Sequence, residues 1–357
     1  MLSLCKFGKT LCAFQKSTLQ SKGFISQINQ FRCLFSAREL GIEGYEKGRR
    51  DAENFVTDPY KYKRKFHLDF GNEPDFPKFE NGLKRLLFVM EKDDNDINIL
   101  KDALYTLIRK QKEHSGYKYI FGPVIMRVLY YLNLPIVAIE FLDDKLIGQL
   151  FTEITGHQVL LDLLYENKMY ETLLRVRESR PFESKYIDAL VLAAYYRINT
   201  PEALDKAFDY WKKMEEIQVK HPFRKSLTFV AGMAVKHNRP EIALEVLECI
   251  FKDFHVTVRQ IKLLAWCQLG RFGKITDMFR TIIKRHKELN RNDEYTSLEV
   301  LDKIEKSLDQ NGPELKKFLA LRKEIKSLGL ITEETLDDML CAPFPVKLQS
   351  NQYHRNK

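Results

Sequence analysis

The sequence predicts an all-α protein built as a right-handed solenoid of antiparallel helix pairs. An apolar pattern recurs along the middle of the chain at a period close to 34 residues. The 357 residues include only 16 glycines and 12 prolines, which favours helices over a turn-rich β architecture. No segment alternates between apolar and polar residues over a useful length, so strands are not expected.

Five turn residues set the register of the repeat: Asn133, Asn167, Asn199, Asn238 and Gly270. The spacings between them are 34, 32, 39 and 32 residues. Apolar residues stand 5, 8, 9 and 12 positions after each of the last three turns: Leu204, Ala207, Phe208 and Trp211; Ala243, Val246, Leu247 and Ile250; Ile275, Met278, Phe279 and Ile282. This is the stripe of one helix face. The stripe is shorter after Asn133 and only partial after Asn167. Because a helix pair of this length cannot bury its apolar face alone, the copies must stack.

Residues 1–38 have the composition of a mitochondrial transit peptide. They contain no Asp or Glu, are rich in Ser and Thr, and carry six basic residues: Lys6, Lys9, Lys16, Lys22, Arg32 and Arg38. Such a leader is typical of mitochondrial import, here to the matrix; a disordered basic tail is the alternative. The whole chain has a net charge of 58 minus 49, or +9, and the leader supplies six of these charges. The remainder is near +3, so global charge is no argument for nucleic-acid binding.

Two segments precede the regular repeats. Residues 39–77 are expected to form an irregular connector, because glycines and prolines punctuate a charged stretch there. Residues 78–116 predict an N-terminal helix pair, with apolar stripes from Leu83 to Met90 and from Ile99 to Leu107. The acidic loop between these two helices could hold magnesium, but a solvated loop with Asp96 capping the second helix is the preferred interpretation.

Residues 117–291 are predicted to form the repeat array of about five helix pairs. The first helix of a pair ends near its turn residue, and four of them are expected at Val159–Glu166, Tyr186–Arg197, Leu227–His237 and Val258–Leu269. The 39-residue interval leaves room for a longer second helix, from Pro201 to about Val219.

Residues 292–342 are predicted to form a C-terminal helical cap, with helices near 294–308, 313–328 and 332–340. The Thr332 hydroxyl is expected to cap the last of these. Residues 343–357 form a polar tail that is expected to be loose.

The sequence carries no recognisable catalytic or cofactor motif. It contains no phosphate-binding glycine loop, no His-Glu-x-x-His pair and no Gly-x-Ser-x-Gly elbow. No Cys or His spacing suits zinc. The most apolar run, from Tyr119 to Leu134, carries Arg127 and is too short to span a membrane. We therefore expect a non-enzymatic protein without cofactor, metal, small-molecule substrate or membrane span.

Basic residues gather around the last repeat. Between Val256 and Arg291, nine Lys and Arg residues stand against Asp277 and Glu288, a net charge of +7. Such a strip can neutralise phosphates with salt-dependent affinity, and aromatic residues such as Trp266 can stack on unpaired bases. The alternative is that the charges are solvated helix faces and the aromatic residues belong to the core.

Several stretches resemble those of a metazoan member of the pentatricopeptide repeat family. They are Tyr119–Pro123, Leu161–Leu164, Tyr196–Glu202, Leu330–Thr332 and Leu336–Cys341. The repeat period also fits tetratricopeptide repeats, but their Trp-Leu-Gly-Tyr pattern is missing. The resemblance implies a non-catalytic protein that binds mitochondrial RNA, as a single-stranded transcript. It would act in transcript maturation, processing or stability and thereby support the respiratory chain.

The resemblance also indicates candidate contacts. Arg259 and Lys262 share the face of a first helix that lines the concave surface in family members, and Lys284 and Arg285 extend the basic strip. Base-reading members carry a short polar residue ten positions before the turn; here Pro123, His157, Ala189, Thr228 and Gln260 occupy those positions. Only Thr228 fits, so a base-by-base code does not carry over. The candidate RNA-binding residues are Arg259, Lys262, Lys284, Arg285, Thr228 and Gln260.

A second function class remains open. The degenerate base-reading positions and the modest charge of the chain without its leader also suit a protein-interaction scaffold. Such a scaffold would dock on the mitochondrial ribosome or serve as an assembly factor. RNA-processing or ribosomal proteins are therefore possible partners beside RNA.

Overall fold

The computed structural model describes residues 34–71, 75–113, 119–216, 223–250, 254–289, 294–309 and 312–344. Most of the predicted leader and tail, residues 1–33 and 345–357, lies outside this part of the chain. The longer elements are α1 (Ile42–Glu53), α2 (Pro59–Gly71), α3 (Phe76–Val89), α4 (Asp94–Glu113), α5 (Gly122–Tyr131), α6 (Pro135–Asp143), α7 (Ile154–Glu166), α8 (Tyr170–Ser179), α9 (Lys185–Ile198), α10 (Pro201–Glu216), α11 (Arg224–Lys236), α12 (Pro240–Glu248), α13 (Val256–Gln268), α14 (Phe272–Leu289), α15 (Leu298–Ser307), α16 (Pro313–Ser327) and α17 (Leu336–Leu340).

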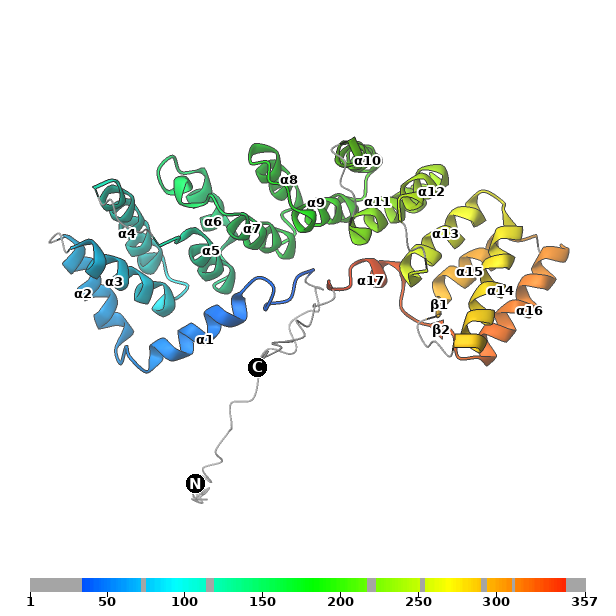
Figure 1. Ribbon diagram of the computed structural model, residues 1–357, viewed down its shortest axis with the longest axis horizontal. Coiled ribbons are helices and arrows are strands. Elements are labelled where there is room, and N and C mark those ends of the chain that lie inside the picture. The colour runs from blue at the N-terminus through cyan, green and yellow to red at the C-terminus, as the bar shows by residue number, and fades with distance from the viewer. Residues whose placement is uncertain are drawn as a thin grey trace, which may run out of the picture. The chain divides into compact units, whose positions relative to one another are not determined.

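The helices form antiparallel pairs that stack in sequence order (Figure 1). The first helices of the pairs, α5, α7, α9, α11 and α13, pack each against the next. The second helices, from α6 to α12, lie along one side of this row (Figure 1). The predicted all-α fold of stacked helix pairs is confirmed. The described strands are the two-residue β1 (Thr296–Ser297) and β2 (Ile331–Thr332), which pair in parallel.

Four of the five predicted turn residues adopt the left-handed conformation that ends a first helix. Their φ angles are 50° at Asn133, 52° at Asn199, 54° at Asn238 and 64° at Gly270. Asparagine and glycine tolerate this region better than other residues do, which explains their recurrence.

The second repeat departs from the predicted register by one residue. Asn167 has a φ of −82°, and Lys168 adopts the left-handed conformation instead, with a φ of 60°. Counting from Lys168 places Leu173 and Val176 at the fifth and eighth positions of the stripe, and both are buried. The weak match at Asn167 was therefore an error of register.

The segment expected to be an irregular connector contains two helices. On α1, Ile42 and Tyr45 are buried; on α2, Phe66 is buried against α3. Gly48, which suggested a loop, lies instead in a close helix contact: a Cβ there would be 2.5 Å from the Phe88 ring. The absence of a side chain at Gly48 therefore allows α1 to approach α3 closely.

A buried ion pair joins this added region to the predicted N-terminal helix pair, α3 and α4. The Lys63 ammonium of α2 lies 2.7 Å from the Asp96 carboxylate of α4, and both side chains are at most 8% exposed. Asp96 also accepts a hydrogen bond from the Glu91 amide at 2.8 Å. Its carboxylate is thus occupied by protein groups.

The C-terminal region continues the stack for one further pair. Helix α15 packs against α13 and α16 packs against α14. The expected Thr332 cap is replaced by Thr335, whose hydroxyl accepts a hydrogen bond from the Asp338 amide in a capping box. The predicted loose tail, residues 343–357, includes Phe344, which is 3% exposed and packed into the core. None of the described helices is long and apolar enough to cross a membrane.

Candidate nucleic-acid interface

The row of first helices has one side that faces α1 and α17, and we call this side the inner face. Helix α1 packs against α3 and α5, and α17 packs against α11 and α13 (Figure 1). The second helices from α6 to α12 lie on the opposite side. The inner face corresponds to the surface on which the sequence placed the base-reading positions.

Four of the five base-reading positions are inaccessible. The exposed fractions are 2% at His157, 0% at Ala189, 2% at Thr228 and 0% at Gln260, whereas Pro123 is half-buried. The Thr228 hydroxyl donates to the Lys225 carbonyl at 2.9 Å. Thr228 and Gln260, both candidate RNA contacts, therefore lie in the interior of the described part of the protein.

The strand β1 occupies the inner face at Gln260. The Gln260 amide nitrogen donates to the Tyr295 carbonyl at 3.2 Å, and its oxygen accepts from the Ser297 amide at 3.3 Å. These bonds use both ends of the side-chain amide, as a nucleobase edge would. The chain thus satisfies this side chain with its own backbone.

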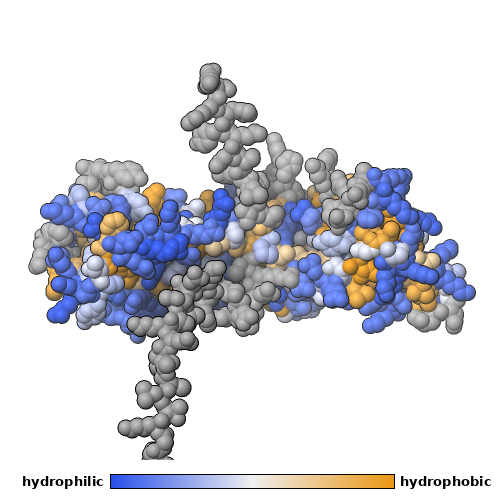
Figure 2. Space-filling view, turned by 90° about the horizontal axis from the view of Figure 1, so that it is seen from below, coloured by the Kyte–Doolittle hydropathy of each residue, from blue (hydrophilic) through white to orange (hydrophobic). Residues whose placement is uncertain are grey.

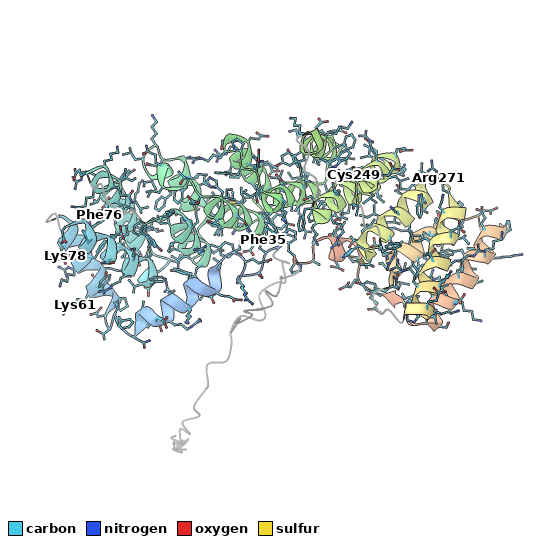
Figure 3. The ribbon with its side chains drawn as sticks, viewed as in Figure 1. Phe35, Lys61, Phe76, Lys78, Cys249 and Arg271 are labelled. Carbon is cyan, nitrogen blue, oxygen red and sulfur yellow. The ribbon has the colours of Figure 1, made fainter. Side chains whose placement is uncertain are left out.

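The two ends of the described chain meet on the inner face near α9 and α11. The centres of the Phe35 and Phe344 rings lie 4.6 Å apart. The Tyr186 ring packs against both of them, and the Phe223 ring packs against Phe344. The Phe344 amide donates to the Leu34 carbonyl at 2.8 Å. Figure 3 labels Phe35 where the N-terminal segment reaches the first helices. The predicted leader boundary at residue 38 would remove Leu34 and Phe35, which are 0% and 2% exposed.

Helix α17 is fixed to the first helices through Asp337. Its carboxylate accepts hydrogen bonds from the Tyr196 hydroxyl and, at 2.6 Å, from the Lys236 ammonium. Burial disfavours the charged carboxylate, but these hydrogen bonds and the cations outweigh it and lower the pKa of Asp337. The Lys225 ammonium of α11 adds bonds to the Met339 and Ala342 carbonyls at 3.3 and 2.8 Å. These ion pairs and hydrogen bonds hold α17 and the residues after it against the inner face of α11.

Two of the four predicted cationic contacts form a buried ion triad. The Arg259 guanidinium lies 2.7 Å from the Glu294 carboxylate, and the Arg285 guanidinium lies 3.0 Å from it. The side chains of Arg259, Arg285 and Glu294 are 3%, 16% and 1% exposed. The sequence placed Arg259 and Arg285 on an open basic strip, whereas the structure pairs them in the interior. Glu294 lies beyond the interval over which the charge was counted, and only the folded chain brings it back.

The other two predicted cations reach the surface. Lys284 is 72% exposed and lies 3.9 Å from Glu288, and Lys262 is half-buried. Further exposed cations stand just before α14, on α14 and on α16, which packs beside it: Arg271, Lys274, Arg280, Lys316, Lys317, Lys323 and Lys326. We call these and Lys284 the α14–α16 cations. Hydrophilic residues cover much of this end of the molecule around a smaller hydrophobic area (Figure 2).

Sequence reasoning missed the residues of α16 and the residues that fill the inner face. Lys316, Lys317, Lys323 and Lys326 recur on one short segment, and their charge was a usable signal. No comparable signal marked Phe35 or Phe344, because isolated aromatic residues near chain ends do not reveal their partners.

Comparison with known proteins gives a consistent set of relatives. The chain is 25% identical over 267 residues to the mitochondrial pentatricopeptide repeat-containing protein 2 of Mus musculus, covering 72% of the chain and 68% of the relative. The Xenopus laevis protein of that name is 23% identical over 275 residues, 76% of the chain and 72% of the relative. The Danio rerio protein is 23% identical over 336 residues, 91% of the chain and 85% of the relative. No family model and no solved structure matches the chain.

Proposed function

Because the chain is homologous to mitochondrial pentatricopeptide repeat-containing protein 2, we propose that it is a non-catalytic RNA-binding protein of the mitochondrial matrix. Its ligand is a single-stranded mitochondrial transcript. Its role is in the maturation, processing or stability of that transcript, and through it in respiratory-chain function. The observation that carries this proposal is the set of α14–α16 cations on a helical-repeat scaffold.

The mode of binding follows from the chemistry of the available surface. Thr228 and Gln260 are buried, so the mode we propose relies on phosphate contacts rather than on base edges. Exposed Lys and Arg side chains neutralise phosphates and give an affinity that falls with salt. Among the predicted contacts, Lys262 and Lys284 remain the candidates for this role. Arg259 and Arg285 support it indirectly by holding α13, α14 and Glu294 together.

Crosslinking of RNA to the protein in intact mitochondria, followed by sequencing, tests the proposal. The expected result is enrichment of mitochondrial transcripts over a control in which Lys284, Lys316 and Lys323 are replaced by Gln. Recovery of no transcript above background would refute it. The comparison requires that the triple variant is folded. Nearly equal thermal unfolding temperatures of the variant and the natural chain would establish this.

A protein-interaction scaffold of the mitochondrial ribosome, or an assembly factor, is the second candidate. The filled inner face favours the scaffold, because a segment of the same chain already binds there through contacts of Lys225 and Asp337. Purification from mitochondria before and after ribonuclease treatment separates the two. Partners retained after ribonuclease support the scaffold, whereas partners lost with the RNA support the first proposal.

A further inference from the structure

A cavity of about 220 Å³ opens between α13 and α14, on the surface that carries the predicted basic strip. The ion triad of Arg259, Arg285 and Glu294 forms one part of its wall, and Lys274 and Trp266 form others. The volume leaves room for a ligand much larger than a single water molecule. The cavity lies apart from Thr228, which faces the covered part of the inner face.

The cavity has aromatic and apolar surface on more than one side. The Trp266 side chain is half-buried against the core, and Phe254 at the start of α13 is 59% exposed. The Arg285 guanidinium carbon lies 4.0 Å from the centre of the Phe254 ring. This contact and the Glu294 carboxylate hold the guanidinium in place, so little ordering of Arg285 is required when a ligand binds.

Positive charge prevails among the ionic residues of the wall. Arg259, Lys274 and Arg285 stand against Asp277 and Glu294, and Asp277 also pairs with Arg280 at 3.6 Å. The Lys274 ammonium forms no ion pair with any residue in the described part of the chain. It is exposed at the edge of the cavity and is available to a phosphate.

We propose that the α13–α14 cavity holds one unpaired nucleotide of a single-stranded RNA. Its base stacks against Trp266, and its phosphate pairs with Lys274 at the rim. A phosphodiester carries a single negative charge, which matches the surplus of one positive charge in the wall. Every base has a π face, so such a pocket accepts a nucleotide without reading its identity. This inference rests on the proposed RNA-binding function and names a site for it.

Tryptophan fluorescence provides a direct readout, because the chain has only two tryptophans. Trp211 lies on α10 and is 3% exposed, and its replacement by Phe leaves Trp266 as the only emitter. A fluorescently labelled single-stranded RNA reports affinity through its anisotropy in the same samples. The expected result is a change in Trp266 emission that saturates together with the anisotropy. In the converse variant, Trp266→Phe, Trp211 emission should stay constant.

Lys274→Gln tests the phosphate contact, and Lys61→Gln on α2 is its matched control. Both lysines are exposed, and both substitutions remove one charge. We expect Lys274→Gln to weaken RNA binding severalfold and to reduce the Trp266 response at a fixed RNA concentration. Lys61→Gln should leave both the affinity and the Trp266 response at the same RNA concentration unchanged. If Trp211→Phe does not fold, 5-fluorotryptophan incorporated into the natural chain gives two fluorine resonances that report the same events.

The outcomes separate this inference from the proposed function. RNA that binds without changing Trp266, or an unchanged response in Lys274→Gln, overturns the cavity site and leaves RNA binding intact. An acidic peptide that changes Trp266 emission as strongly as RNA also overturns it, since it would bind by charge without a base. If no RNA binds to the folded protein, both proposals fail.

Discussion

The backbone amide of Phe344 donates a 2.8 Å hydrogen bond to the carbonyl oxygen of Leu34. The bond joins the beginning and the end of the described chain on the inner face of the helix stack. Both residues are buried, and Phe35 and Phe344 share an aromatic cluster with Tyr186 and Phe223. The inner face near α9 and α11 is therefore part of the hydrophobic core. This closure changes what can be expected of the termini and of the RNA-binding residues.

Removal of the Phe344 ring should destabilise the whole stack. We expect Phe344→Ala to lower the free energy of unfolding by about 3–5 kcal/mol, as for other buried aromatic residues. Phe55→Ala is the matched control, because Phe55 is 84% exposed and its loss should cost about 0.5 kcal/mol or less. Urea denaturation measures both. Equal effects of the two substitutions would contradict the packing described for Phe344.

The burial of Leu34 predicts where the leader expected from the sequence ends. A chain that begins at Leu34 should unfold at a higher temperature than one that begins at Glu39, since the latter lacks Leu34 and Phe35. The difference arises from two side chains that are 0% and 2% exposed. We therefore expect N-terminal sequencing of the mature protein to find a first residue no later than Leu34. A mature chain that starts at Glu39 and is equally stable would disprove this.

The second repeat offers a test of turn geometry. Lys168 has a φ of 60°, a conformation that costs a non-glycine residue about 1–2 kcal/mol, whereas Asn167 has a φ of −82°. Lys168→Gly should therefore leave stability unchanged or raise it, by up to about 1 kcal/mol. Asn167→Gly should lower it, because it adds freedom to the unfolded chain without relieving strain. Thermal unfolding of the two variants gives the order; the reverse order would favour the register first predicted from the sequence.

Local patterns in the sequence predicted the helix pairs well. The stripes after Asn199, Asn238 and Gly270 depend on residues within one helix, so the pattern alone identifies them. The one-residue error at Asn167 arose because asparagine adopts the left-handed conformation more readily than lysine does, whereas here Lys168 adopts it and Leu173 and Val176 are buried in the matching register.

Long-range contacts were beyond the reach of such patterns. The pairing of Arg259 with Glu294 joins residues from different elements, and the sequence shows only that one is basic and the other acidic. The helices α1 and α2 were mistaken for a connector because their stabilisation comes from α3, α4 and α5. The charge surplus around α14 was visible in the sequence, but which of its cations reach solvent depended on the fold.

Stability should respond to pH through Asp162 of α7. Burial, reinforced by the nearby Glu166 carboxylate, raises the pKa of Asp162 well above its ordinary value, although a hydrogen bond from Tyr130 opposes the shift. The folded state then binds more protons than the unfolded chain above the ordinary carboxyl pKa, so stability falls as pH rises through that window. Asp162→Asn removes this titration.

We accordingly expect Asp162→Asn to be more stable than the natural chain at neutral and alkaline pH. The difference should shrink as the pH falls through about 4 and should level off below about 3, where the carboxyl group is protonated in both states. Thermal unfolding at a series of pH values measures it. An advantage that stays constant with pH would show that the Asp162 charge is not its cause.

The exposed cations near the C-terminal end should determine the salt dependence of RNA binding. The triple variant Lys284→Gln, Lys316→Gln and Lys323→Gln removes three charges from the α14–α16 cations. If all three contact phosphates of a single strand, the slope of log affinity against log salt should become shallower by about 2. Replacement of Lys61, Arg64 and Lys65 by Gln removes the same charge from the exposed surface of α2 and serves as the matched control (Figure 3 labels Lys61). It should leave the slope nearly unchanged. Equal slopes for the two triple variants would place the RNA contacts elsewhere on the protein.

The Arg259→Gln substitution should behave differently from both triple variants. It leaves part of the Glu294 charge unpaired in the interior. We therefore expect it to lower the free energy of unfolding by about 3–5 kcal/mol.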